Sequence, residues 1–177
     1  MSKLKTIAGV GLLSCTLLQS AWAQEPESCK QVRFAEIGWA DIAATTGVAM
    51  TLSEGLGYQT RKIMASVPIA FTGVQKGQID VFLGYWAPSM DAVIEPFTKD
   101  DGVKVLPTAN LEGAKYTLAV PTYLAEAGLK SFQDIAKFKK ELDGKIYGIE
   151  PGNDGNLLIE KMIKEDQFGM GDFRMVE

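Results

Sequence analysis

Short apolar runs alternate with amphipathic stretches along the chain from residue 31 onward. Strand-like runs occupy residues 32–37, 59–64, 79–83, 103–106 and 145–149. Helical patterns occupy residues 42–56, 68–76, 90–97, 122–127, 131–142 and 156–166, and residues 116–120 favour an extended segment that stops at Pro121. This alternation is typical of an α/β protein with a mainly parallel sheet and crossover helices.

The first helical pattern predicts a buried face. Apolar and small residues recur on one side of it, at Ile42, Thr46, Ala49, Met50 and Leu56. Two glycines, at 55 and 57, close this helix, and Gly77 ends the next one, which carries Pro68 in its first turn.

Each of three loops follows a predicted strand and precedes a predicted helix. They cover residues 38–41, 84–89 and 151–155. In open α/β sheets such loops meet outside the carboxyl ends of the strands, where ligands bind. The first two loops contain Trp39 and Trp86, so we expect both indoles at one site.

Aromatic residues and a carboxylate are suited to a cation that has no N–H groups, such as a quaternary ammonium. Trp39, Trp86 and Tyr116 offer aromatic faces and Asp41 offers charge, while the Asn153 amide and nearby backbone N–H groups can meet a polar group of the ligand. Structural interpretations remain open for each. The aromatic residues, Tyr116 above all, suit a core, Asp41 suits an N-cap, and residues 151–156 suit a plain turn with a cap.

The first 23 residues have the pattern of an export signal. Lys3 and Lys5 precede an apolar run at residues 7–18 and a small-residue cleavage site at residues 21–23. The run is too short for a permanent transmembrane helix, which needs about 20 apolar residues. Two alternatives stay open: a buried N-terminal helix, and a lipoprotein signal cut before Cys15.

Charge and composition narrow the function. Cleavage after residue 23 removes two of the 18 basic residues and none of the 22 acidic ones, which leaves a net charge of −6. An acidic chain disfavours nucleic acid as a partner and favours cations. The sequence contains no histidine, which removes the usual general base and metal ligand, so we expect no catalysis, cofactor or metal. Cys29 is left without a partner cysteine.

Four segments in the same order resemble the periplasmic choline-binding proteins of ABC importers, within the wider family of glycine betaine and choline binding proteins. They are residues 32–41, 80–88, 110–119 and 145–156, and the likeness runs from about residue 28 to the end. It implies two α/β lobes joined by a hinge, with the signal at residues 1–23, lobe I at residues 24–117 and part of lobe II at residues 118–177. Permease and ATPase subunits would be the partners.

The resemblance also implies a role for each candidate residue. Trp39, Trp86 and Tyr116 would be walls of an aromatic box, Asp41 would counter the ammonium or accept from a hydroxyl, and Asn153 would hold the hydroxyl end. Family chains are longer: the part beyond Glu177 supplies a further tryptophan wall, a return crossing and a cysteine for Cys29. We therefore expect an N-terminal fragment that ends at a strand near residues 174–176.

The sequence thus predicts a solute-binding protein for choline. Glycine betaine fits less well because its carboxylate would be repelled by Asp41. Glycine betaine, carnitine and acetylcholine remain alternative ligands. Two other classes also remain: an exported α/β enzyme that uses Asp41 and Asp154, and a truncated product without activity of its own.

Overall fold

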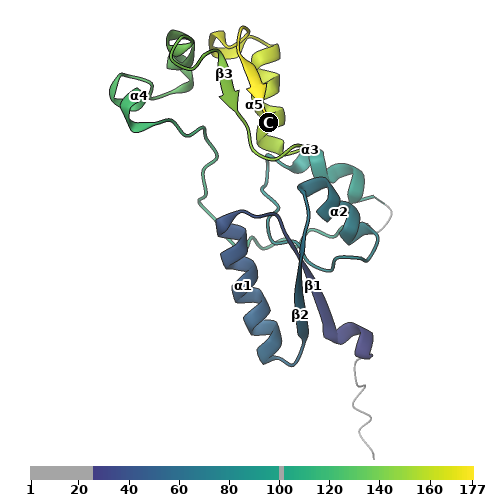
Figure 1. Ribbon diagram of the computed structural model, residues 1–177. Helices are drawn as coiled ribbons and strands as arrows, with labels where there is room; N and C mark the ends of the chain where they lie inside the picture. The colour runs from purple at the N-terminus through teal and green to yellow at the C-terminus, as the bar shows by residue number, and fades with distance from the viewer. Residues whose placement is uncertain (1–25, 100–101) are drawn as a thin grey trace, which may run out of the picture.

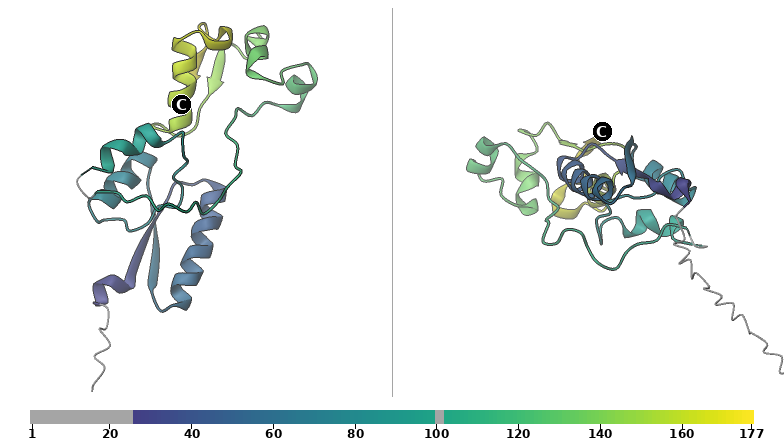
Figure 2. Two further views of the ribbon diagram at one scale, coloured as in Figure 1. Left: turned by 180° about the vertical axis from the view of Figure 1, so that it is seen from behind. Right: turned by 90° about the horizontal axis from the view of Figure 1, so that it is seen from below.

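The computed structural model describes residues 26–99 and 102–177, so the predicted export signal and Cys15 lie outside the described residues. The chain is α/β and forms two bodies joined by one extended crossing that includes residues 114–121 (Figures 1 and 2). One body, here called the N-terminal lobe, is coloured purple to teal in Figure 1, and the other, the C-terminal lobe, is coloured green to yellow. The predicted fold class is confirmed.

The sheet of the N-terminal lobe is parallel. β1 (Gln31–Glu36) follows a 3-10 turn, η1 (Glu27–Lys30), and pairs along its whole length with β2 (Gln59–Met64). On the other edge of β1, Val81 forms a single bridge with Phe34. The strand predicted over residues 79–83 is therefore reduced to one bridge, held by hydrogen bonds from Ala35 N to Val81 O (2.8 Å) and from Val81 N to Arg33 O (3.1 Å).

Helix α1 (Ala40–Gly55) crosses between these two strands. It buries Ile42 and Thr46 as predicted, but Leu56, predicted to face inward, is 78% exposed. The reason is that α1 carries apolar residues on most of its sides, so periodicity alone does not define its buried face. Among its outward residues, Val48 and Leu52 are also exposed.

The core of the N-terminal lobe forms around α2 (Val67–Gln75), whose first turn contains Pro68 as predicted. Phe71 of this helix is buried against the rings of Phe82, Tyr85 and Phe97. The last of these belongs to a short helical stretch, α3 (Asp91–Ile94) and η2 (Glu95–Phe97), as the sequence predicted. Burying one such phenylalanine contributes about 1.5 to 3 kcal/mol.

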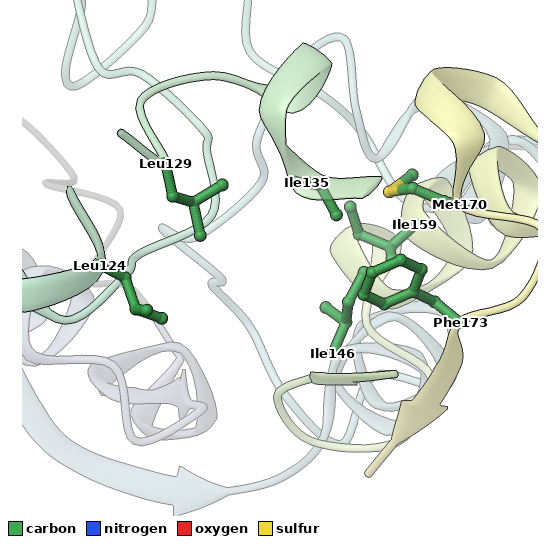
Figure 3. Packing of buried hydrophobic residues seen from close by; sticks show 7 residues of the cluster. All are labelled: Leu124, Leu129, Ile135, Ile146, Ile159, Met170 and Phe173. Atoms are coloured by element: carbon green, nitrogen blue, oxygen red, sulfur yellow. The ribbon is translucent and has the colours of Figure 1, made fainter. Parts of the chain in front are cut away.

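The C-terminal lobe has its own parallel pair and its own core. β3 (Lys145–Tyr147) pairs with β4 (Arg174–Val176), and α5 (Asp154–Lys164) packs on β4 and on η4 (Gln167–Gly169). The short helix α4 (Thr122–Glu126) contributes Leu124 to the core. The strand expected near the end of the chain is confirmed. Figure 3 shows the buried residues of this core: Leu124, Leu129, Ile135, Ile146, Ile159, Met170 and Phe173.

Residues 131–142, predicted as helical, are helical over only part of their length. They form a 3-10 helix, η3 (Phe132–Phe138), followed by turns. Its apolar residues Phe132, Ile135 and Phe138 recur every third position, and all three pack on the core of the C-terminal lobe. Three residues per turn is the period of a 3-10 helix, so this packing selects it over an α-helix.

Two further segments lie outside the regular elements. The prediction of a strand over residues 103–106 is wrong. No described strand lies beside this segment to accept its backbone hydrogen bonds, and Leu106 is 71% exposed. Residues 114–121 are extended without a ladder partner among the described residues. In the described part of the chain, no helix combines the length and the apolar character that crossing a bilayer requires.

Candidate ligand-binding site

Four of the five predicted site residues form one connected cluster between the lobes. Trp39 precedes α1, Trp86 lies in the loop after the Val81 bridge, Tyr116 lies on the extended crossing, and Asn153 is the N-cap of α5. The fifth, Asp41, lies in the first turn of α1.

The aromatic part of this cluster is anchored in the N-terminal lobe. Trp39 and Trp86 are half-buried and pack on the same core residues, Val67, Phe71, Met90 and Ile94. Backbone hydrogen bonds fix the second loop, with Met90 N donating to Trp86 O at 2.8 Å. The ring of Tyr116 lies 5.7 Å from that of Trp86, centroid to centroid, at 47°. The extended crossing therefore brings a third aromatic face to the two indoles.

The sequence left Tyr116 open as a core residue, and the structure excludes that. The residue is 46% exposed, and its hydroxyl lies beside Asn153 and Gly155. Its hydroxyl donates to Asn153 Oδ1 at 2.8 Å. A Cβ on Gly155 would lie 2.0 Å from this hydroxyl oxygen, so the contact depends on the glycine.

Asn153 joins several of these groups through its amide, and it is 1% exposed. Its Oδ1 accepts from Tyr116 Oη and, at 2.8 Å, from Gly155 N, which is the N-cap hydrogen bond of α5. Its Nδ2 donates to Glu150 Oε1 at 2.9 Å. The cap interpretation of this loop is confirmed, although α5 begins at Asp154 and not at the predicted residue 156.

Glu150 extends the network across the gap between the lobes. Its Oε2 accepts from Trp39 Nε1 at 3.2 Å. The sequence analysis missed Glu150 because a carboxylate before Pro151, in a turn-rich loop, has the pattern of a solvated turn. Glu150 directly follows a predicted strand, next to one of the three loops expected to meet. This position was the signal in the sequence that could have identified it.

Asn156 holds the loop that presents Glu150. This buried residue accepts from Ile149 N through Oδ1 (3.0 Å), and its Nδ2 donates to the carbonyl oxygens of Ile149 (3.2 Å) and Glu150 (3.3 Å). A Cβ on Gly148 would lie 2.5 Å from Asn156 Oδ1. The chain after β3 is thereby fixed on both sides of the carboxylate.

The electrostatic field at the site is negative. The pKa of Tyr116 rises from 10 to about 12, first because the hydroxyl is desolvated and then because the charges of Asp154 and Glu150 oppose phenolate formation. A hydrogen bond from the Gly155 backbone acts weakly in the opposite direction. The carboxylates of Asp154 and Glu150 therefore place negative charge close to the Tyr116 hydroxyl.

The two aspartates of the region differ in their surroundings. Asp154 is 2% exposed, and within the described residues neither of its carboxylate oxygens has a hydrogen-bond partner. It occupies the first turn of α5, where the helix dipole favours negative charge. Asp41 is exposed, and it is not the N-cap that the sequence allowed, because Trp39 occupies the N-cap position and α1 begins at Ala40.

Comparison with known proteins identifies the family. A family model described as the substrate-binding domain of an ABC-type glycine betaine transport system, OpuAC, matches residues 30–176. The chain belongs to this family. Its members are substrate-binding proteins of transporters and not enzymes, and the resemblance found in the sequence is confirmed.

Solved structures in this family are similar to the chain. A choline-binding protein of an ABC transporter in complex with choline is 53% identical, with a TM-score of 0.79 over 86% of this chain and 53% of the other. An unliganded, semi-closed choline-binding protein is 52% identical, with a TM-score of 0.73 over 85% and 52% of the two chains. The chain therefore spans about half the length of these proteins.

Two further proteins extend the comparison. An uncharacterized protein of Chromohalobacter salexigens, ORF1, is 49% identical over 139 residues, which cover 78% of this chain and 87% of that protein. A glycine betaine and L-proline binding protein of Borrelia burgdorferi is 18% identical with a TM-score of 0.59, over 82% of this chain and 53% of the other. This last likeness concerns the fold alone.

Proposed function

We propose that this chain binds choline between its two lobes as the substrate-binding component of an ABC importer. The observation that carries the proposal is the gathering of Trp39, Trp86 and Tyr116 around a buried amide in a negative field. The choline-binding protein solved with choline, 53% identical to this chain, supports it.

Aromatic faces supply most of the attraction. A quaternary ammonium donates no N–H hydrogen bond, and each desolvated face contributes up to about 2 kcal/mol to its binding. With three faces and the attraction of nearby carboxylates, the sum approaches the roughly 8 kcal/mol that corresponds to micromolar affinity. Because Tyr116 is 46% exposed, its full contribution requires that the lobes close on the ligand.

The carboxylates decide between choline and glycine betaine. Glu150 and Asp154 place negative charge beside Tyr116, and in the proposal Asp41, at the exposed N-terminal end of α1, adds a third charge. These carboxylates repel a ligand that has its own carboxylate and weaken its binding, whereas they do not repel a ligand that has a hydroxyl. In the proposal Asp41 counters the ammonium or accepts from the hydroxyl.

Asn153 meets the polar end of the ligand. Two hydrogen bonds occupy Oδ1 and one occupies Nδ2, which leaves one N–H of the amide. This N–H suits the hydroxyl oxygen of choline as an acceptor. The aromatic faces then hold the ammonium and the amide holds the hydroxyl.

The wider role follows from the family. We propose that residues 1–23 direct export to the periplasm, that residues 24–117 and 118–177 provide the two lobes, and that the partners are a permease and an ATPase. Carnitine, acetylcholine and glycine betaine are the alternative ligands.

Calorimetric titration of the chain with choline and with glycine betaine tests the proposal. We expect choline to bind at least about tenfold more tightly, and Asp41→Asn to weaken choline more than betaine, by about one hydrogen bond to a charged acceptor. Trp86→Leu should weaken both ligands, whereas Tyr123→Leu, at an exposed ring on α4, should change neither. Equal affinities for both ligands, or no binding by a chain shown to be folded, would contradict the proposal.

A further inference from the structure

One carboxylate links a side chain of the N-terminal lobe to the polar end of the site. Glu150 Oε2 accepts from Trp39 Nε1 (3.2 Å), and Glu150 Oε1 accepts from Asn153 Nδ2 (2.9 Å). Trp39 stands before α1 and Asn153 caps α5, so the two donors come from different lobes. Each oxygen of the Glu150 carboxylate therefore accepts a hydrogen bond from one residue of the candidate site.

The bond to Glu150 fixes which way the Asn153 amide points. A flipped amide would set its oxygen against the carboxylate, with two acceptors facing, and its NH₂ against Gly155 N, with two donors facing. Both contacts would be repulsive. With the carboxylate in place, the amide has no free acceptor and meets a ligand only as a donor.

The other bond fixes the indole of Trp39. Its ring packs on the core residues of the N-terminal lobe on one side, and its N–H would lose its acceptor if Glu150 were absent. A half-buried donor without an acceptor favours rotation of the ring toward water. Such a rotation would tilt the aromatic face away from the cation.

We propose that Glu150 is the positioning residue that couples the aromatic wall of the site to its amide through one hydrogen bond to each lobe. The inference rests on the proposed function for the identity of the ligand. The hydrogen bonds of Glu150 do not depend on that function. Glu150 acts through Trp39 and Asn153 and need not touch the ligand itself.

Isosteric substitution tests the coupling. In Glu150→Gln one of the two donors faces an NH₂ group, so we expect the Kd for choline to rise about tenfold to a hundredfold, as for loss of a hydrogen bond to a charged acceptor. Glu150→Asp keeps the charge but is too short to reach both donors, and it should lose affinity similarly. Glu160→Gln, at an exposed position on α5, removes the same charge elsewhere and should leave the Kd unchanged.

A double-mutant cycle separates positioning from general destabilisation. Trp39→Phe keeps an aromatic face but removes the N–H, so it breaks the same bond as Glu150→Gln. We expect the fold-loss of the double variant to be smaller than the product of the two single losses. Independent losses that multiply, or Glu150→Gln binding choline as Glu160→Gln does, would overturn the proposal.

A ligand-free readout keeps this test separate from the proposed function. In a Trp22→Phe, Trp86→Phe background Trp39 is the remaining tryptophan of the chain. Adding Glu150→Gln should increase acrylamide quenching of Trp39 emission, while adding Glu160→Gln should not. If the parent chain fails to bind choline but quenching rises, the function is wrong and the positioning role stands. Unchanged quenching overturns the positioning role.

Discussion

At the scale of single residues, the site depends on close approach at Gly155. The Tyr116 hydroxyl occupies the space where a side chain at position 155 would begin, and from there it reaches Asn153. Because Gly155 lies in the first turn of α5, a larger residue would suit the helix and still displace the tyrosine. The helix would therefore favour a larger residue at position 155, whereas the contact between Tyr116 and Asn153 requires glycine there.

Gly155→Ala tests this conflict. We expect a loss of stability of about 1 to 3 kcal/mol from overpacking, and weaker choline binding as Tyr116 leaves the amide. Gly47→Ala is the matched control, because an added Cβ meets nothing within 4 Å there and should stabilise α1 by about 0.5 to 1 kcal/mol. Thermal unfolding and choline titration of both variants provide the comparison, and equal behaviour would contradict the account.

The titration of Tyr116 gives a second residue-scale prediction. Its pKa of about 12 lies above the usual 10, so the folded state holds the phenol proton more tightly than the unfolded state does. The resulting stabilisation is fully present below pH 10 and is lost as the pH rises toward 12. Phenolate absorbance should show late ionisation of Tyr116 and of Tyr85, whose pKa is also about 12 through burial and its contact with Asp91.

Tyr116→Phe should remove one of these two late components and leave the other. A phenolate titration that is complete near pH 10 in the folded parent chain would contradict the enclosed position of the Tyr116 hydroxyl.

Sequence reasoning predicted Trp39, Trp86 and Asn153 as members of one cluster and missed Glu150, which joins Trp39 to Asn153. Trp39 and Trp86 could be predicted because loops after parallel strands converge, and that rule needs only the order of elements. Glu150 was missed although its place after a predicted strand pointed to the same loops, because its partner Trp39 lies 111 positions away in the sequence. The exposed state of Tyr116 likewise depends on a crossing segment that has no ladder partner in the described chain.

At the scale of elements, a side-chain brace holds the reduced third strand of the N-terminal lobe. The Arg33 guanidinium donates to both carboxylate oxygens of Asp80, at 2.8 and 2.7 Å, and Arg33 N donates to Asp80 Oδ2 at 2.7 Å. The hydrogen bonds from Arg33 hold the pKa of Asp80 below its usual value. This brace sits next to the one backbone bridge, at Val81.

Asp80→Asn should therefore lower the unfolding midpoint more than Asp172→Asn, which breaks an exposed pair with Lys139. Since the pKa of Asp80 is depressed by folding, its contribution is present above pH 4 and fades as the pH falls below that value. Unfolding midpoints at pH 7 and pH 3 measure this. Equal shifts for the two variants at pH 7 would show that the brace contributes nothing.

The elements that the sequence predicted well are those set by local pattern. β1, β2 and α2 fall within about a residue of expectation, because their apolar spacing, glycines and proline act over a few positions. The segments at residues 79–83 and 103–106 failed as strands because a strand needs a neighbour, which local pattern does not supply. A helix was predicted over residues 131–142, and the structure has one over residues 132–138, but the prediction did not distinguish a 3-10 helix from an α-helix.

At the scale of the molecule, two separate cores meet at one polar and aromatic cluster. Each lobe packs its own buried residues, and the described contacts between lobes gather at Trp39, Glu150, Tyr116 and Trp86. The indoles belong to one lobe and the amide to the other, so under the proposed function a ligand would contact the full set only when both lobes hold it. The order of elements predicted the fold class and the convergence of the loops, while the distances that join the two halves of the cluster had to come from the structure.

The most direct test of this arrangement is an NMR measurement of NOEs between the trimethylammonium protons of choline and the aromatic ring protons of the chain. The account predicts NOEs to Trp39, Trp86 and Tyr116 together, with an upfield ring-current shift of the choline methyl signal. Methyl protons that keep their free chemical shift, or NOEs to rings outside this cluster, would contradict it.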